Sequence, residues 1–197
     1  MRFTLVSMSM ILAAASLVAL PQAHANEIEQ GLFGRDIAPE KNAYACFIRK
    51  YTKAHLASHP QQNVRDMALF VNSRPDEENQ RQYQLTMRVG FRTIKQSFDA
   101  FGACYMGNDS TKKLHCGIDC DGGTINVRLK DEKSILLDIP TSARVSVVDD
   151  TDEPDDLPKG AKFGLDDKVF RLDRTDIATC LPLVADDAVK ADIVAGQ

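Results

Sequence analysis

Two alternating apolar runs meet at a glycine-rich centre in KLHCGIDCDGGTINVRLK, residues 113–130. The apolar positions keep one parity on each side of that centre: Cys116, Ile118 and Cys120 before it, and Ile125, Val127 and Leu129 after it. Alternation of this kind is typical of half-buried strands. Because glycine adopts positive φ without steric cost, we predict a two-residue hairpin turn of the primed type.

The turn can be placed in two ways. On Gly122-Gly123 it pairs Cys120 with Ile125, and on Asp121-Gly122 it pairs Ile118 with Ile125. Both registers keep the apolar side chains on one face, so the prediction of a hairpin does not depend on the choice.

The spacing of Cys104 and Cys116 predicts a second hairpin. Their midpoint lies within residues 107–111, a run of turn-forming residues. Directly opposed strand residues have Cβ atoms about 5 Å apart, close to disulfide geometry. We therefore predict a Cys104–Cys116 disulfide. A Cys116–Cys120 bridge is disfavoured, because four residues of a strand span roughly 13 Å.

Residues 1–25 have the features of a secretory signal peptide. A positive residue, Arg2, precedes an apolar run at 8–20, and small residues flank a cleavage site near Ala25. We expect a periplasmic or secreted protein with no membrane span in the mature chain, since no later segment is long and apolar enough.

All five cysteines lie in the exported part, where disulfides are favoured. An odd number leaves one thiol without a partner in the chain. With Cys104 and Cys116 paired, we predict a second disulfide between Cys120 and Cys180 and a free thiol at Cys46.

Further strands are predicted at 64–71, 83–92, 134–139, 143–148 and 168–173, with Phe98 and Phe101 capping the core. Residues 39–58 fit either a helix or a strand at 44–51 followed by a helical turn, and their aromatic content favours the strand. The predicted fold is mainly β, a single antiparallel meander forming a barrel-like structure or a sandwich, with a short N-terminal helical segment. The chain divides into the signal peptide 1–25, an N-terminal arm 26–42, a β-rich domain 43–184 and a flexible C-terminal tail 185–197.

Three blocks of the chain carry a resemblance. They are CFIRKY with HLASHPQQNV (46–51 and 55–64), CGIDCDGG (116–123), and DDKVFRLDR (166–174) followed by Cys180. Together they resemble a group of small exported bacterial envelope proteins that have no assigned activity. In that group a further cysteine often lies between the second and third blocks, and its absence here would account for the odd cysteine count.

Few residues are candidates for chemistry. His55 and His59 would share a face of a helix and could hold a metal with a third ligand, for which His115 is the remaining mature histidine. Asp119 and Asp121, or the acidic residues of 149–156, could coordinate calcium, but neither stretch has the spacing of a helix-loop-helix calcium site. A packed helical turn and a solvated acidic loop account for the same residues, and we expect neither a metal nor a cofactor.

The sequence therefore favours a non-catalytic role. There is no Gly-x-Ser-x-Gly elbow and no phosphate-cradling glycine loop. The net charge is −4 and the basic residues are scattered, which disfavours nucleic-acid binding. We expect a binding or interaction module for an envelope component, a protein or a small apolar ligand. The alternative is a periplasmic hydrolase or metal-dependent enzyme built on the same domain.

Overall fold

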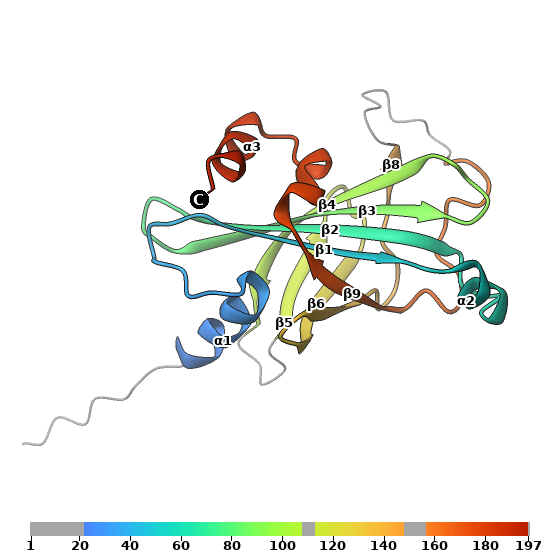
Figure 1. Ribbon diagram of the computed structural model, residues 1–197, viewed down its shortest axis with the longest axis horizontal. Helices are drawn as coiled ribbons and strands as arrows, with labels where there is room; N and C mark the ends of the chain where they lie inside the picture. The colour runs from blue at the N-terminus through green and yellow to red at the C-terminus, as the bar shows by residue number, and fades with distance from the viewer. Residues whose placement is uncertain (1–21, 108–112, 148–156, 197) are drawn as a thin grey trace, which may run out of the picture.

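The structure is a computed structural model that describes residues 22–107, 113–147 and 157–196 (Figure 1). Its strands are β1 (Ala43–Lys50), β2 (Val64–Pro75), β3 (Arg81–Phe91), β4 (Ser97–Met106), β5 (Lys113–Ile118), β6 (Thr124–Asp131), β7 (Ser134–Asp138), β8 (Ser146–Val147) and β9 (Val169–Thr175). Eight of them close into a barrel in the order β3-β2-β1-β9-β7-β6-β5-β4, with β4 pairing back onto β3. Every pair is antiparallel, which confirms the predicted fold class and selects the barrel.

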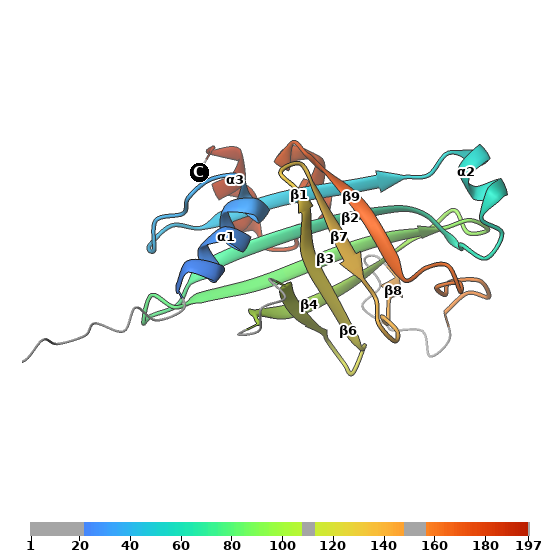
Figure 2. The same ribbon diagram turned by 90° about the horizontal axis from the view of Figure 1, so that it is seen from below.

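The helical segments are α1 (Gln22–Phe33), α2 (Lys53–Ser58), the 3-10 helix η1 (Ile177–Leu183) and α3 (Asp187–Val194). The ambiguous stretch 39–58 is a strand followed by a helical turn, the alternative that its aromatic residues favoured. Figures 1 and 2 show α1 and α3 on opposite sides of the long ribbon formed by β1, β2 and β3. Helix α2 lies toward the far end of that ribbon.

The inward positions of the strands build the main core. Every second residue of β3 is buried, as the alternation predicted, and Leu85, Ile125 and Val127 are at most 2% exposed. Met67, Met87 and Phe91 belong to the same cluster, and Met106 packs against it. Asp167 closes one end of the barrel: its buried carboxylate accepts hydrogen bonds from the backbone N–H groups of Asn63, Val64 and Gly164.

The hairpin that the spacing of Cys104 and Cys116 predicts forms in the expected register. Cys104 lies opposite Cys116 in the β4–β5 register, and the two sulfur atoms are bonded at 2.06 Å. Tyr105 faces His115 on the outer surface of the same hairpin. The turn itself falls at 108–112, outside the described residues.

The β5–β6 hairpin, within residues 113–130, forms in a different register from either of the two predicted ones. Cys116, and neither Cys120 nor Ile118, pairs with Ile125. The N–H of Gly122 donates to the carbonyl of Asp119, and the two residues between them, Cys120 and Asp121, both have φ of +56°. Positive φ at both central positions is the pattern of a type I′ turn. The turn type was right, but it lies two residues before Gly122-Gly123 and on non-glycine residues.

The second disulfide corrects the predicted pairing. It joins Cys46 to Cys180, while Cys120 is a free, exposed thiol at the tip of the hairpin. Cys46 is on the outward face of β1, yet it is only 1% exposed because η1 and α3 lie over it. A second apolar core forms there, outside the barrel, from Cys46, Phe70, Cys180, Leu183, Val184, Val189 and Ile193.

Other expectations also need correction. The tail beyond residue 185 is not flexible throughout, because α3 packs into the outer core and Asp192 accepts hydrogen bonds from Asn42 and Tyr44. The arm 26–42 contains most of α1. Phe101 points outward and is 41% exposed, and only Ser146–Val147 of the strand predicted at 143–148 pairs as a strand. Residues 1–21 and 148–156, which carry most of the predicted signal peptide and the acidic loop, lie outside the described residues.

Candidate functional site: a cleft between a helix and a hairpin

Helix α1 packs on the barrel through very few apolar side chains. Ile28 and Leu32 are one helical turn apart and at most 2% exposed, and Phe33 follows at 7%. Gly34, at φ +70°, ends the helix, and its N–H donates to the carbonyl of Gln30 at 2.8 Å. A glycine in left-handed conformation is the common C-terminal cap of a helix.

Gly31 allows the helix to approach the β6–β7 hairpin. A Cβ atom at this position would lie 2.1 Å from a δ-carbon of Leu129 on β6, which is far inside van der Waals contact. The helix and the hairpin therefore meet so closely that a larger residue at position 31 would require the Leu129 side chain to shift. The same glycine lowers helix propensity, which explains why the arm 26–42 gave no helical signal in the sequence.

A polar network fixes α1 to the long strands. Arg81 on β3 forms an ion pair with Glu29 at 3.2 Å, and both side chains are nearly buried, at 11% and 15% exposure. The hydroxyl of Tyr83 donates to the same carboxylate. Burial, followed by the nearby Glu29 carboxylate, raises the pKa of Tyr83 well above its ordinary value, so the phenol remains a donor. These contacts fix one side of the helix to the barrel.

Arg174 on β9 fixes the other side. Its guanidinium donates to the carbonyls of Gly31 and Leu32 and lies 4.8 Å from the centre of the Phe47 ring. Carbonyls in the last turn of a helix have no partner within the helix, and a cation there also complements the helix dipole. Burial lowers the pKa of Arg174 from its ordinary value, but the value stays far above neutrality for a guanidinium.

The β6–β7 hairpin forms the opposite wall. Its register shifts between Leu129 and Asp131, and the N–H of Lys133 donates to the Asp131 carboxylate at 3.0 Å. Lys130, Glu132 and Lys133 are exposed, and their side chains make no hydrogen bond or ion pair with the part of the chain that the structure describes. The hairpin thus presents charges of both signs toward solvent.

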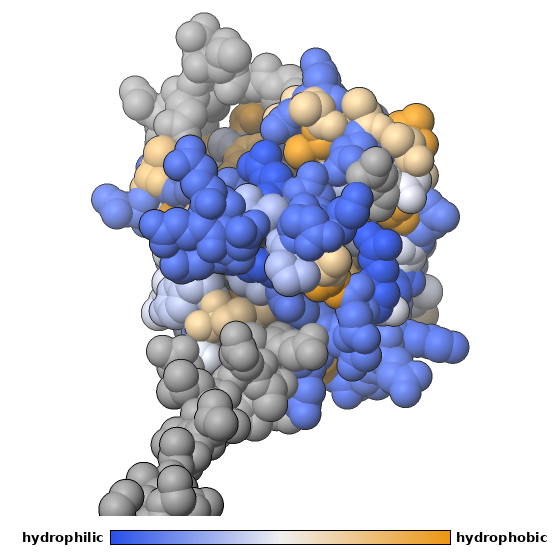
Figure 3. Space-filling model, turned by 90° about the vertical axis from the view of Figure 1, so that its left-hand side faces the viewer, coloured by the Kyte–Doolittle hydropathy of each residue, from blue (hydrophilic) through white to orange (hydrophobic). Residues whose placement is uncertain are grey.

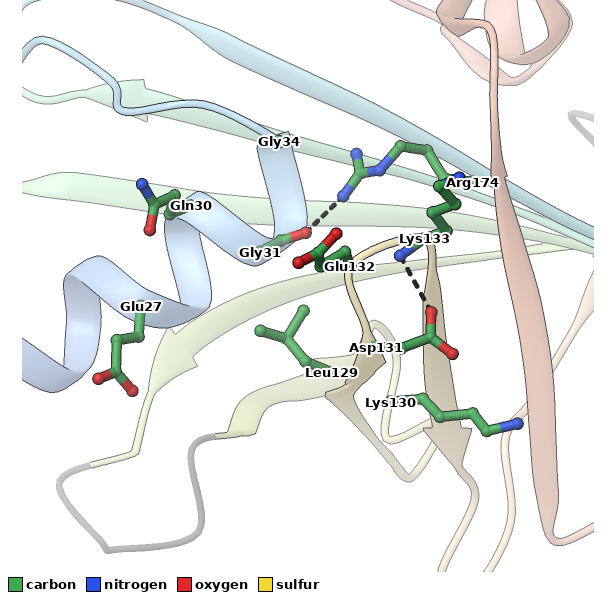
Figure 4. A pocket seen from close by; sticks show the side chains of 10 residues that line it. All are labelled: Glu27, Gln30, Gly31, Gly34, Leu129, Lys130, Asp131, Glu132, Lys133 and Arg174. Atoms are coloured by element: carbon green, nitrogen blue, oxygen red, sulfur yellow. Dashed lines mark hydrogen bonds between the residues drawn. The ribbon is translucent and has the colours of Figure 1, made fainter.

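Between α1 and this hairpin lies a cleft of about 730 Å³ (Figure 4). It is lined by Glu27, Gln30, Gly31, Gly34, Leu129, Lys130, Asp131, Glu132, Lys133 and Arg174. Leu129 lies between the helix and the hairpin, Glu132 points toward α1, and Arg174 reaches the carbonyl of Gly31 on the helix (Figure 4). Figure 3 views the end of the molecule that carries α1 and α3: hydrophilic residues dominate that face, and hydrophobic ones form small areas between them. The cleft therefore has an apolar floor and a charged rim.

The residues considered as candidate metal ligands lie in separate places. The rings of His55 and His59 stack at 4.1 Å on α2, where Nε2 of His55 is bonded to the side chain of Gln62, and His115 stacks on Tyr105 at a different place in the barrel. Within residues 22–107, 113–147 and 157–196 there is no group of three or more His, Cys, Asp or Glu side chains arranged to hold a metal ion. Asp119 and Asp121 flank Cys120 in the hairpin turn.

Fold and cleft together define a small antiparallel barrel, stabilised by two disulfides, with a helix packed beside one hairpin to form an open groove. No helix in the described ranges is long and apolar enough to cross a membrane. Comparison with protein-family models, with curated proteins and with solved structures finds no match for this chain.

The sequence did not indicate this cleft. Its residues come from three separate segments, 27–34, 129–133 and 174, none of which contains a recognisable motif. The one available signal was Gly31, a glycine between Ile28 and Leu32 on a potential helix face, which suggests close backbone approach.

Proposed function

We propose that this protein is a non-catalytic, exported binding module that holds an extended segment of another envelope protein in the cleft between α1 and the β6–β7 hairpin. The observation that carries the proposal is the composition of the cleft. Its volume falls in the range of about 300–1,000 Å³ common for ligand pockets, and its lining combines the apolar side chain of Leu129 with charged side chains of both signs. An apolar side chain of the partner would occupy the floor beside Leu129 and Gly31.

The charges of the rim indicate the chemistry of that partner. Lys130, Asp131, Glu132 and Lys133 lie on the hairpin and Glu27 lies on α1, so the rim has no dominant sign. Such a rim complements a peptide with one apolar anchor residue flanked by charged residues of both signs, because opposite charges across an interface favour the correct partner and register.

Export is part of the same proposal. Two disulfides within one chain are the pattern of a protein that matures in an oxidising compartment, since cytosolic thiols are kept reduced. Cleavage near Ala25 would give a mature chain that begins at Asn26, and the intact mass of the protein recovered from the envelope fraction tests this directly. A mass corresponding to the full 197 residues would contradict export by this route.

Photo-crosslinking tests the site. A benzoylphenylalanine residue would replace Gln30 or Glu132, both in the cleft, and in a control variant would replace Lys53 on α2, toward the other end of the long strands (Figure 1). We expect one discrete protein adduct from the two cleft positions and none from the control. Equal adducts at all three positions, or none in the cleft, would refute the proposed site.

Charge exchange tests the recognition. The double variant Glu132→Lys/Lys133→Glu keeps the net charge but exchanges the positions of two opposite rim charges, and we expect it to weaken binding of the crosslinked partner about tenfold. The matched control is Lys53→Glu/Asp166→Lys, which makes the same exchange away from the cleft. A partner bound equally by both variants would exclude recognition by the rim.

A further inference from the structure

The outer wall of the barrel over β4, β5 and β6 carries a second group of surface residues, distinct from the cleft. Strand register places Tyr105, His115 and Asn126 in one row across the three strands, and Ala103, Gly117 and Thr124 in the next. We call these six residues the neutral face. The face lies beside the part of the barrel that η1 covers. Cys46, Phe70, Thr86 and Phe101 are neighbours across β1 to β4 and point outward. The first three are buried, whereas Phe101 is 41% exposed.

An aromatic platform stands at one side of this face. The rings of Tyr105 and His115 stack with centroids 5.4 Å apart and planes inclined by 22°. Tyr105 is 65% exposed, an unusually large exposure for an aromatic side chain on a strand. Stacking occupies one face of each ring and leaves the other available. Large exposed aromatic side chains of this kind are enriched at binding sites.

The floor beside the platform is open. Ala103 and Gly117 are both exposed, and a Cβ atom added to Gly117 would meet no atom within 4 Å. Phe101 bounds the floor on its other side, four residues from Tyr105 along β4, or roughly 13 Å. The face is therefore an open area of surface between two exposed aromatic positions.

The six residues of the neutral face are themselves uncharged, and charged side chains border them at Lys113 and Arg128 in the next row and at Asp138 opposite Asn126. None of the six residues of the neutral face is Asp, Glu, Lys or Arg, although 26% of the chain is charged. The hydroxyl of Thr124 and the amide of Asn126 make no hydrogen bond with any described residue, so both can serve a ligand. Gln84 borders Ala103 on β3 and offers a third polar side chain. Within the neutral face a ligand meets only aromatic, amide and hydroxyl groups, and these are suitable partners for a neutral ligand rich in hydroxyl groups.

From this combination we infer that the neutral face binds a neutral oligosaccharide. The C–H face of a sugar ring packs on the free ring face of Tyr105, which His115 supports from its other side, since aromatic side chains join a large apolar surface to a polar edge. The sugar hydroxyls exchange hydrogen bonds with Thr124, Asn126 and Gln84. The floor at Ala103 and Gly117 gives the ring its room. This inference does not rest on the cleft or on its proposed partner.

Binding can be measured with three neutral probes of different linkage: cellohexaose, maltohexaose and chitohexaose. The chain has no tryptophan and four tyrosines, of which Tyr105 is the exposed one, so tyrosine fluorescence reports directly on the face. We expect at least one hexasaccharide to quench this fluorescence in a saturable way at millimolar or lower concentration. In the NMR spectrum the same titration should shift backbone amides of β4 and β5 and leave those of α1 unchanged.

Two variants decide whether the neutral face is the binding site. Tyr105→Ala removes the platform, and Gly117→Val fills the floor without disturbing the fold, because the space above Gly117 is empty and valine suits a strand. We expect each to weaken binding about tenfold or more, a loss typical of a central contact, while the melting temperature of Gly117→Val does not fall. For Tyr105→Ala the NMR titration replaces the lost fluorescence signal. Leu165→Ala, at an exposed apolar residue elsewhere, is the control and should bind as the wild type does.

Three results would overturn the inference. One is the absence of binding for all three hexasaccharides. Another is undiminished binding by Gly117→Val. The third is a glycan-independent shift of the same amides by an envelope protein, which would assign the face to a protein partner instead.

Discussion

One disulfide lies in the core of the barrel and the other in the layer of η1 and α3 outside it, and the two differ in position and in the length of chain they close. Cys104–Cys116 lies inside the barrel and joins adjacent strands 12 residues apart in sequence. Cys46–Cys180 lies outside the barrel and joins β1 to η1 across 134 residues. The first crosslinks residues that strand pairing already opposes. The second ties a covering layer, η1 and α3, to an outward strand face that would otherwise meet water.

The difference shows how far a local pattern determines structure. Hairpin register follows from turn position and alternation, so the inner bridge is a consequence of local pairing. The outer bridge depends on where a segment from the end of the chain docks, and no local periodicity specifies that. The position of the free cysteine was also mispredicted. Cys120 is four residues after Cys116 and was expected on the same strand face, but it lies in the turn and outside the strand.

Removing the outer bridge should have the largest effect. Chain-entropy reasoning gives about 5 kcal/mol for crosslinking a loop of this length in the unfolded state, so Cys46→Ala/Cys180→Ala should lose up to about that amount of unfolding free energy. Urea unfolding followed by circular dichroism measures it. In hydrogen exchange the amides of η1 and α3 should lose protection first, while those of β3 and β4 remain slow.

Removing the inner bridge should cost less. The same relation gives about 3 kcal/mol for the 12-residue separation of Cys104 and Cys116. Hydrogen exchange in Cys104→Ala/Cys116→Ala should remain slow in β4 and β5, because the ladder on both sides of each strand persists. If this variant were less stable than the outer one, loop length would not govern the contrast between the two regions.

The barrel was largely predictable because period-two alternation is a property of consecutive residues. Tyr83 to Phe91 and Ile125 to Leu129 form strands with the expected inward faces. The strand at Ala43–Lys50 was harder because both of its faces are buried: Phe47 points into the barrel while Cys46 and Ile48 contact the outer core. A strand covered on both sides loses its alternation, so the same residues also fit a helix.

The cleft was not predictable for a related reason. Helix α1 has two well-buried aliphatic residues, a glycine in its interior and two polar anchors supplied by β3 and β9. None of these features indicates a packed helix in the sequence, because the contacts of Arg174 and Arg81 with α1 exist only in the folded chain. Phe101 was also mispredicted from the sequence. It points outward and is exposed, but the outward residues Thr86 and Asp99 near it are buried, so alternation does not distinguish an exposed outward position from a covered one.

The attachment of α3 gives a smaller, pH-dependent effect. Hydrogen bonds from Asn42, at 2.9 Å, and from Tyr44 hold the pKa of Asp192 below its ordinary value of 3.8. The carboxylate therefore stabilises the fold above that value, and the contribution is lost as the pH falls through the lower pKa of the folded state. Because Asp192 is partly exposed, the contribution should be less than about 1 kcal/mol.

Stability measured against pH separates this bond from the disulfide beside it. Asp192→Asn should be less stable than the wild type at pH 6, and the difference should shrink by pH 3. Asp187→Asn, at an exposed acid on the same helix, is the control. A constant difference between pH 6 and pH 3 would mean that the charge of Asp192 does not contribute.

The smallest effect on stability should come from substituting Cys120, which belongs to neither disulfide. Its side chain is exposed at the tip of the turn, so Cys120→Ser should change the free energy of unfolding by no more than about 0.5 kcal/mol. The native protein should take up one equivalent of maleimide, at Cys120, as peptide mapping after non-reducing digestion would show. Label at Cys46 or Cys180 would contradict the outer bridge, and label at Cys104 or Cys116 the inner one. Uptake at Cys120 alone would establish that both regions are closed by disulfides in the folded chain.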